Sequence, residues 1–124
     1  MMTTHKGYGN APVLPETVVA PGVTIYHGGT TTYSARPRIA LYEKGLRAEF
    51  NVPVFPGMTG TRSDEYRKIN PKMVIPAVHH DGNLITESIN IVEYLDEVFP
   101  DTYRLLPSTP AKRAEARYVL HRCN

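Results

Sequence analysis

The stretch that decides the fold is PKMVIPAVHHDGNLITESINIVEYLDEVFP, residues 71–100. Residues 77–80 and 84–86 are short apolar segments that flank Asp81-Gly82, and an Asp-Gly pair favours the tight turn of a β-hairpin. From Glu87-Ser88 the apolar spacing changes to that of a helix, which ends at Pro100. The buried face of this helix is predicted to carry Ile91, Val92, Leu95, Val98 and Phe99. The segment therefore predicts two antiparallel strands followed by an amphipathic helix.

Upstream of the hairpin, the pattern predicts a strand, a helix, a second strand and a short helix. The strands are VTIY (23–26) and AEFNVPVF (48–55), and SARPRIALYEKGL (34–46) forms the helix between them. Pro37 falls in the first turn of that helix, and Gly45 suits its C-terminal cap. The short helix begins near Ser63, with two acidic residues in its first turn, and stops at Asn70-Pro71.

The order of these elements indicates a fold class. A strand–helix–strand unit forms a parallel pair, and the hairpin adds antiparallel strands to the same sheet. A mixed four-stranded sheet with helices on both faces is a thioredoxin-like α/β fold. A ferredoxin-like split βαβ fold is the nearest alternative, and the short middle helix and the position of the hairpin fit it poorly.

Composition narrows the classes of function. The chain has 124 residues, a net charge of +2 and one cysteine, Cys123, which excludes an internal disulfide framework and a Cys-rich zinc site. The charge is too small and too evenly mixed to predict nucleic-acid binding. No apolar run approaches the ~20 residues of a membrane span, and residues 1–22 lack the apolar core of a secretory signal. We therefore expect a cytoplasmic protein.

Four segments in order carry a resemblance to a known family. They are YSARPRIALYEKGL, KINPKMVIPAV, DGNLITESINIVEYLDEVFP and LLPSTPAKRAEAR. From residue 23 to its end the chain resembles cytosolic glutathione transferases, and within them bacterial glutathione-dependent β-aryl etherases. The resemblance implies a glutathione-binding domain at residues 23–104 after a flexible Pro/Gly-containing leader at 1–22. Residues 105–124 then correspond to a linker and the start of an all-helical domain that is incomplete here.

The implied activity is transfer of glutathione, as cosubstrate, to an electrophilic and aromatic substrate, by conjugation or by β-aryl ether cleavage. The full-length protein is then expected to form a homodimer. The alternative is a non-catalytic glutathione-transferase-like interaction or dimerisation module. A disulfide reductase would need a cysteine where this chain has Thr31.

Glutathione reacts as its thiolate, and a free thiol of pKa ≈ 8.5 is mostly protonated at neutral pH. Lowering that pKa by two units needs about 2.7 kcal/mol, which one hydrogen bond to the anion supplies. By resemblance, the thiol-activating hydroxyl lies seven residues before Arg38, at Thr31. Ser34 is the second candidate, although capping of the helix is its more ordinary role. Thr30, Thr32 and Tyr33 in the same loop are further alternatives.

The resemblance also implies the residues that bind glutathione. Ile75-Pro76 corresponds to a cis-proline whose preceding backbone pairs with the cysteinyl backbone, and Glu87-Ser88 to the site for the γ-glutamyl group. Arg62 is the candidate for the glycyl carboxylate, with a solvated surface arginine as the alternative. Val74, beside that end, stands where many relatives carry Lys or Gln.

Three other features are interpreted as structural. His79 and His80 are adjacent in a strand and face opposite ways, so they cannot chelate one metal, and no metal site is expected. Cys123 is read as an ordinary helix residue. The basic side chains Lys112, Arg113 and Arg117 are expected to form a solvated face of the last helix, which begins at Thr109-Pro110.

Overall fold

The computed structural model describes residues 16–28 and 32–122. Its elements are β1 (Val18–His27), α1 (Thr32–Glu43), β2 (Leu46–Pro53), α2 (Asp64–Ile69), β3 (Ala77–His80), β4 (Asn83–Thr86), α3 (Ser88–Val98) and α4 (Pro110–Arg122). The strands form one sheet in the order β2-β1-β3-β4, in which β1 and β2 are parallel and the other neighbours antiparallel. The predicted thioredoxin-like arrangement is confirmed.

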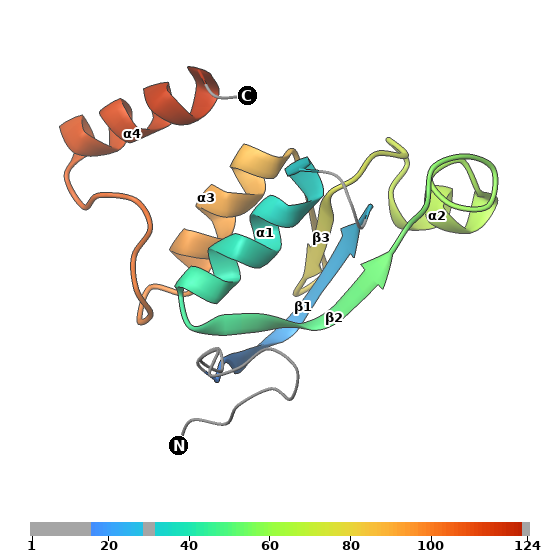
Figure 1. The fold of residues 1–124 in the computed structure, drawn as a ribbon, viewed down its shortest axis with the longest axis horizontal. Helices are drawn as coiled ribbons and strands as arrows, with labels where there is room; N and C mark the ends of the chain where they lie inside the picture. The colour runs from blue at the N-terminus through green and yellow to red at the C-terminus, as the bar shows by residue number, and fades with distance from the viewer. Residues whose placement is uncertain (1–15, 29–31, 123–124) are drawn as a thin grey trace, which may run out of the picture.

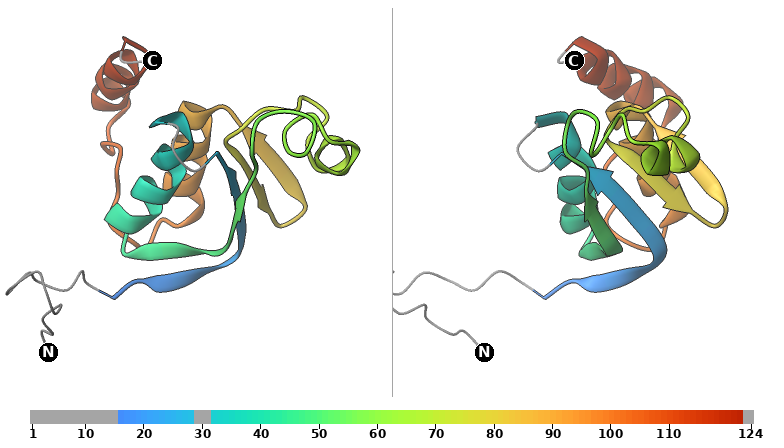
Figure 2. Two further views of the ribbon diagram at one scale, coloured as in Figure 1. Left: turned by 45° about the vertical axis from the view of Figure 1, so that its right-hand side comes forward. Right: turned by 90° about the vertical axis from the view of Figure 1, so that its right-hand side faces the viewer.

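The two faces of the sheet are covered differently. Helices α1 and α3 lie side by side on one face (Figures 1 and 2), where Val23 and Ile25 of β1 are fully buried beneath them together with Ile91 and Leu95 of α3. Alternate residues of β1 face the other side. There the ring of Tyr26 packs edge-on against Tyr66 of α2, with 5.9 Å between the ring centroids. The hydrophobic core is therefore concentrated under α1 and α3.

The turns and caps follow the chemistry of the sequence. The hydroxyl of Ser63 accepts a hydrogen bond from Tyr66 N at 3.0 Å and caps α2. Asp81 and Gly82 both have positive φ, at 49° and 79°, as the tight hairpin turn requires. Gly45 ends α1 with φ of 76°. These predictions are confirmed.

β1 begins earlier than the sequence predicted. Val18 to Ala20 pair with Leu46 to Ala48 of β2, and Ala20 is fully buried. The register shifts between Ala20 and Thr24, which accommodates Pro21 and Gly22 within the strand. The expected leader is therefore wrong for residues 18–22, and residues 1–15 lie outside the part that the structure describes.

The segment between α3 and α4 is held by a buried ion pair. Lys44 Nζ lies 2.8 Å from Asp96 Oδ1, and both side chains are fully buried. The same carboxylate accepts hydrogen bonds from the backbone N–H groups of Leu105 (2.7 Å) and Leu106 (3.0 Å). Lys44 also donates to the carbonyl of Tyr103 at 2.8 Å. The ion pair thus fixes the path of the chain as it leaves the sheet domain.

α4 is tied to α3 by two further ion pairs. Arg117 lies 3.0 Å from Glu93, and Arg113 lies 3.2 Å from Glu97. The expectation of a solvated basic face is therefore wrong for these two arginines, although Lys112 is exposed as expected. None of the helices in the described ranges is long and apolar enough to cross a membrane.

Candidate functional site

A hollow of about 280 Å³ gathers most of the predicted binding residues. Its walls come from the first turn of α1, the loop before β3 and the start of α3. The lining residues are Tyr33, Val74, Ile75, Pro76, Glu87 and Ser88. The structure therefore brings together segments that lie more than 50 positions apart in the sequence.

The loop before β3 contains the Ile75–Pro76 bond, which is cis, as predicted. The carbonyl of Val74 accepts hydrogen bonds from the Tyr66 hydroxyl at 2.6 Å and from the Asn70 side-chain amide at 2.9 Å. Burial raises the pKa of Tyr66 despite its contact with Asn70, so the phenol stays protonated as the donor. Tyr66 and Asn70 position this loop.

The start of α3 forms the opposite wall. Glu87 has φ of 71°, and its carbonyl accepts the hydrogen bond from Ile91 N at 2.8 Å. The first N–H groups of a helix have no partner within the helix, and no side-chain hydrogen bond from Glu87 caps this end. Ser88 is buried among these groups. This end of α3 has the donors that an anionic group requires.

Arg36 of α1 connects the two helices at the hollow. Its Nη1 donates to Ser88 Oγ at 3.0 Å, and its guanidinium lies over the Tyr33 ring, 4.7 Å from the centroid. A positive charge is thereby held beside the start of α3. Sequence reasoning missed Arg36, Tyr66 and Asn70. Arg36 and Asn70 lie inside the resembling segments, whereas Tyr66 lies outside them.

The predicted thiol-activating residues fall in different places. Thr31 and Thr30 lie outside the described residues. Ser34 is fully buried, and its hydroxyl accepts a hydrogen bond from Gly28 N at 3.0 Å. Ser34 is not among the residues that line the hollow. This hydrogen bond joins the first turn of α1 to the end of β1. It is not a helix cap, because Gly28 precedes α1.

Arg62 is not brought to the same hollow. It is exposed and lines a neighbouring hollow of about 660 Å³ together with Arg67, Lys72 and Met73. Val74 follows Met73 directly and is 41% exposed. Within the described ranges, no group of three or more His, Cys, Asp and Glu side chains could hold a metal ion.

The fold is a thioredoxin-like domain with a mixed sheet. Its hollow lies between the cis-proline loop before β3 and the start of α3. Residues 25–103 match the family described as glutathione S-transferase, N-terminal domain. The chain belongs to this family.

Individual relatives agree with this assignment. The chain is 46% identical to the protein LigF of Sphingobium sp. over 94 residues, which cover 75% of this chain and 36% of LigF. It is 42% identical to glutathione S-transferase 3 of Glycine max, over 69% of this chain and 38% of that protein.

Solved structures show the same likeness. The crystal structure of the β-etherase LigF superposes with a TM-score of 0.71 at 44% identity, over 78% of this chain and 40% of LigF. Rice GST1 in complex with glutathione gives a TM-score of 0.65 at 32% identity, over 78% of this chain and 44% of the rice chain. The chain spans less than half the length of each of these relatives.

Proposed function

We propose that this domain binds glutathione in the hollow between the cis-proline loop and the start of α3. The observation that carries the proposal is that Ile75, Pro76, Glu87 and Ser88 line one cavity. The cysteinyl backbone of glutathione would pair with the N–H and C=O of Ile75, in the manner of an added strand. The solved complex of rice GST1 with glutathione supports this choice of ligand.

The γ-glutamyl group would lie at the start of α3. Its carboxylate would accept hydrogen bonds from the free backbone N–H groups and from the Ser88 hydroxyl. Because Arg36 already donates to Ser88 Oγ, the hydroxyl hydrogen is left to point at the ligand. The exposed carboxylate of Glu87 would pair with the ammonium of the same group.

The glycyl end would extend toward the basic hollow next to Val74. Val74 itself carries no charge, so the glycyl carboxylate depends on Arg62 and Lys72, which line that hollow. A guanidinium matches the two oxygens of a carboxylate. Arg62 therefore keeps its predicted role as a proposal, supported by the adjacency of Met73 and Val74 in the chain.

The chemistry proposed for the whole protein is attack of the glutathione thiolate on an electrophile. We assign the thiolate's hydrogen bond to Thr31, because the Ser34 side chain is fully buried and does not line the hollow. The similarity to LigF, whose solved structure is that of a β-etherase, supports an aromatic substrate. Conjugation and β-aryl ether cleavage are the two forms this reaction would take.

Calorimetric titration of the 124-residue chain with glutathione tests the binding proposal. We expect saturable binding that Glu87→Gln weakens, because the ammonium loses its counter-charge. Glu65→Gln, on the exposed side of α2, is the matched control and leaves affinity unchanged. Equal affinity of the two variants, or no binding by the folded chain, would contradict the proposal.

The thiolate absorbance of bound glutathione against pH tests the chemistry in the full-length protein. Thr31→Ala is expected to raise the pKa of the bound thiol and to lower turnover, whereas Thr59→Ala, in an exposed loop, changes neither. Binding with an ordinary thiol pKa in the unaltered protein would instead support the non-catalytic interaction module.

A further inference from the structure

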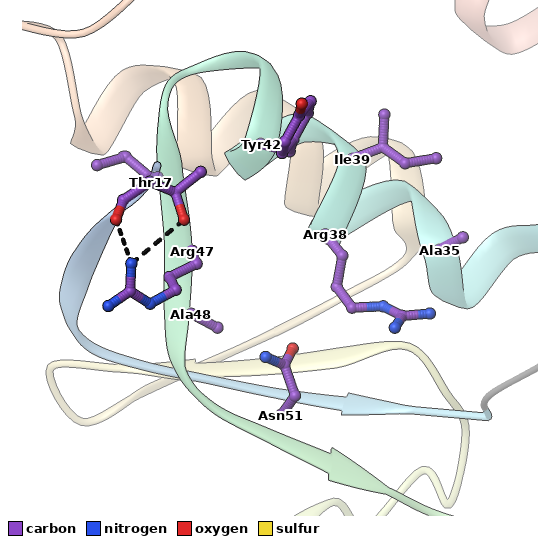
Figure 3. A pocket seen from close by; sticks show the side chains of 9 residues that line it. Thr17, Ala35, Arg38, Ile39, Tyr42, Arg47, Ala48 and Asn51 are labelled. Atoms are coloured by element: carbon purple, nitrogen blue, oxygen red, sulfur yellow. Dashed lines mark hydrogen bonds between the residues drawn. The ribbon is translucent and has the colours of Figure 1, made fainter. Parts of the chain in front are cut away.

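A second hollow, of about 400 Å³, lies between α1 and the edge strand β2 (Figure 3). It shares no lining residue with the hollow at the start of α3. Arg38 projects into it from α1, and Asn51 projects from β2 toward the same space (Figure 3). Neither residue has a part in the proposed glutathione site, so glutathione binding does not explain this hollow.

Arg38 is poised to bind an anion. Its Nε is buried and has no hydrogen-bond partner among the described residues. A buried donor without a partner is unfavourable, and a guanidinium offers Nε and a terminal nitrogen in a fork that fits a carboxylate. No acidic side chain lines this hollow within the described ranges. The charge of Arg38 also contributes, after burial, to the lowered pKa of His27.

The second arginine of the hollow is already engaged. The guanidinium of Arg47 turns away toward Thr17 and donates to its carbonyl and to its hydroxyl (Figure 3). Among the described residues that line this hollow, Arg38 is therefore the cation that remains open, and this favours a ligand with a single negative charge over a phosphate dianion. The Asn51 amide can donate a further hydrogen bond to such a ligand.

The remaining wall is apolar. Ile39 is 57% exposed and Tyr42 is 38% exposed, and both line the hollow one turn apart on α1. These side chains offer a surface for a flat hydrophobic body. We propose that the groove between α1 and β2 binds a small aromatic monocarboxylate, with its carboxylate on Arg38 and Asn51 and its ring against Ile39 and Tyr42.

Titration of the ¹⁵N-labelled chain with benzoate, followed by nuclear magnetic resonance, tests this site. We expect saturable shifts of the Arg38 Nε–H and Asn51 side-chain resonances, and binding of neutral benzamide at least tenfold weaker. Shifts confined to Glu87 and Ser88, equal binding of benzamide, or no binding of benzoate would overturn the proposal. Tighter binding of phenyl phosphate than of benzoate would overturn the assignment of a monocarboxylate.

Substitutions test whether the charge of Arg38 binds the benzoate carboxylate. Arg38→Gln is expected to lower benzoate affinity at least tenfold, whereas Arg67→Gln, on exposed α2, leaves it unchanged. Ile39→Glu places a negative charge at an exposed position of the groove and provides the same test if Arg38→Gln does not fold. Benzoate affinity that is insensitive to Ile39→Glu, or to a folded Arg38→Gln, would contradict the assignment. Glutathione binding is expected to be unaffected by Ile39→Glu, which separates this site from the proposed function.

Discussion

The two ends of α3 are built for opposite purposes. At its start, Glu87 has a positive φ and Ser88 lies among backbone donors that the helix does not use. Toward its other end, Asp96 is fully buried and accepts hydrogen bonds from Lys44, Leu105 and Leu106. One end therefore offers unused hydrogen-bond donors to a ligand, and the other contributes stability. Substitutions at the two ends should separate binding from folding.

The largest effect is expected from Asp96→Asn. The substitution leaves the Lys44 ammonium buried without its counter-charge, and breaking a buried ion pair in this way costs about 3–5 kcal/mol of unfolding free energy. Urea denaturation measures the loss. Asp64→Asn removes half of an exposed pair with Arg67 at 3.6 Å and is the control, expected to change stability by less than about 1 kcal/mol. Equal stability of the two variants would contradict a stabilising role for this end.

A smaller effect of the same carboxylate should appear on acidification. Burial alone would raise the pKa of Asp96, but the hydrogen bonds from Leu105 N, Lys44 and Leu106 N outweigh it and hold the pKa below its usual value. A depressed pKa adds stability that is fully present above the unfolded pKa of about 3.9 and is lost as pH falls through the folded value. Denaturation curves between pH 6 and 2 should show this loss in the unaltered chain and a reduced loss in Asp96→Asn.

This buried pair also marks the limit of sequence interpretation. The helices, the hairpin turn and the Ser63 cap were predictable, because each depends on residues a few positions apart. Lys44 directly follows the end of α1, three positions after the buried Leu41, and a lysine beside Gly45 is typical of an exposed helix end. Its partner is 52 positions away. Periodicity alone does not reveal a charge that is buried only because a distant carboxylate meets it.

The start of α3, where glutathione binding is proposed, was predicted differently. Ile75, Pro76, Glu87 and Ser88 were assigned by family resemblance, and the structure places them around one hollow. Arg36 was not predicted, because its guanidinium extends from α1 to Ser88 of α3, a contact between residues 52 positions apart. Pro21 and Gly22 were assigned to the leader before the first strand. In the structure β1 continues through them, because a register shift between Ala20 and Thr24 accommodates both residues. Thr31, to which the proposed chemistry assigns the thiolate's hydrogen bond, lies outside the described residues and stays a prediction.

At the start of α3, Ser88→Ala should change binding rather than folding. A hydrogen bond to a charged group contributes about 1.5–3 kcal/mol, which corresponds to a loss of glutathione affinity of about ten- to a hundredfold. The unfolding free energy should change by less than about 1 kcal/mol, because Arg36 at this partly buried site can turn to water. Titration calorimetry and urea denaturation measure the two quantities, with the exposed Ser108→Ala as control. Lost stability with unchanged affinity would place Ser88 with the stabilising end.

The smallest effect is expected where α4 meets α3. Arg117→Ala removes the 3.0 Å pair with Glu93, whose side chains are 41% and 19% exposed, so the loss should be at most about 1 kcal/mol. Because this pair joins α4 to α3 and lies away from the hollow, amide exchange should accelerate in α4 while glutathione affinity stays the same. Lys112→Ala, which disrupts only a 3.8 Å pair within α4, is the matched control. A double-mutant cycle with Glu93→Gln isolates the pairwise energy, and a coupling of zero would mean that this contact does not hold α4 against the domain.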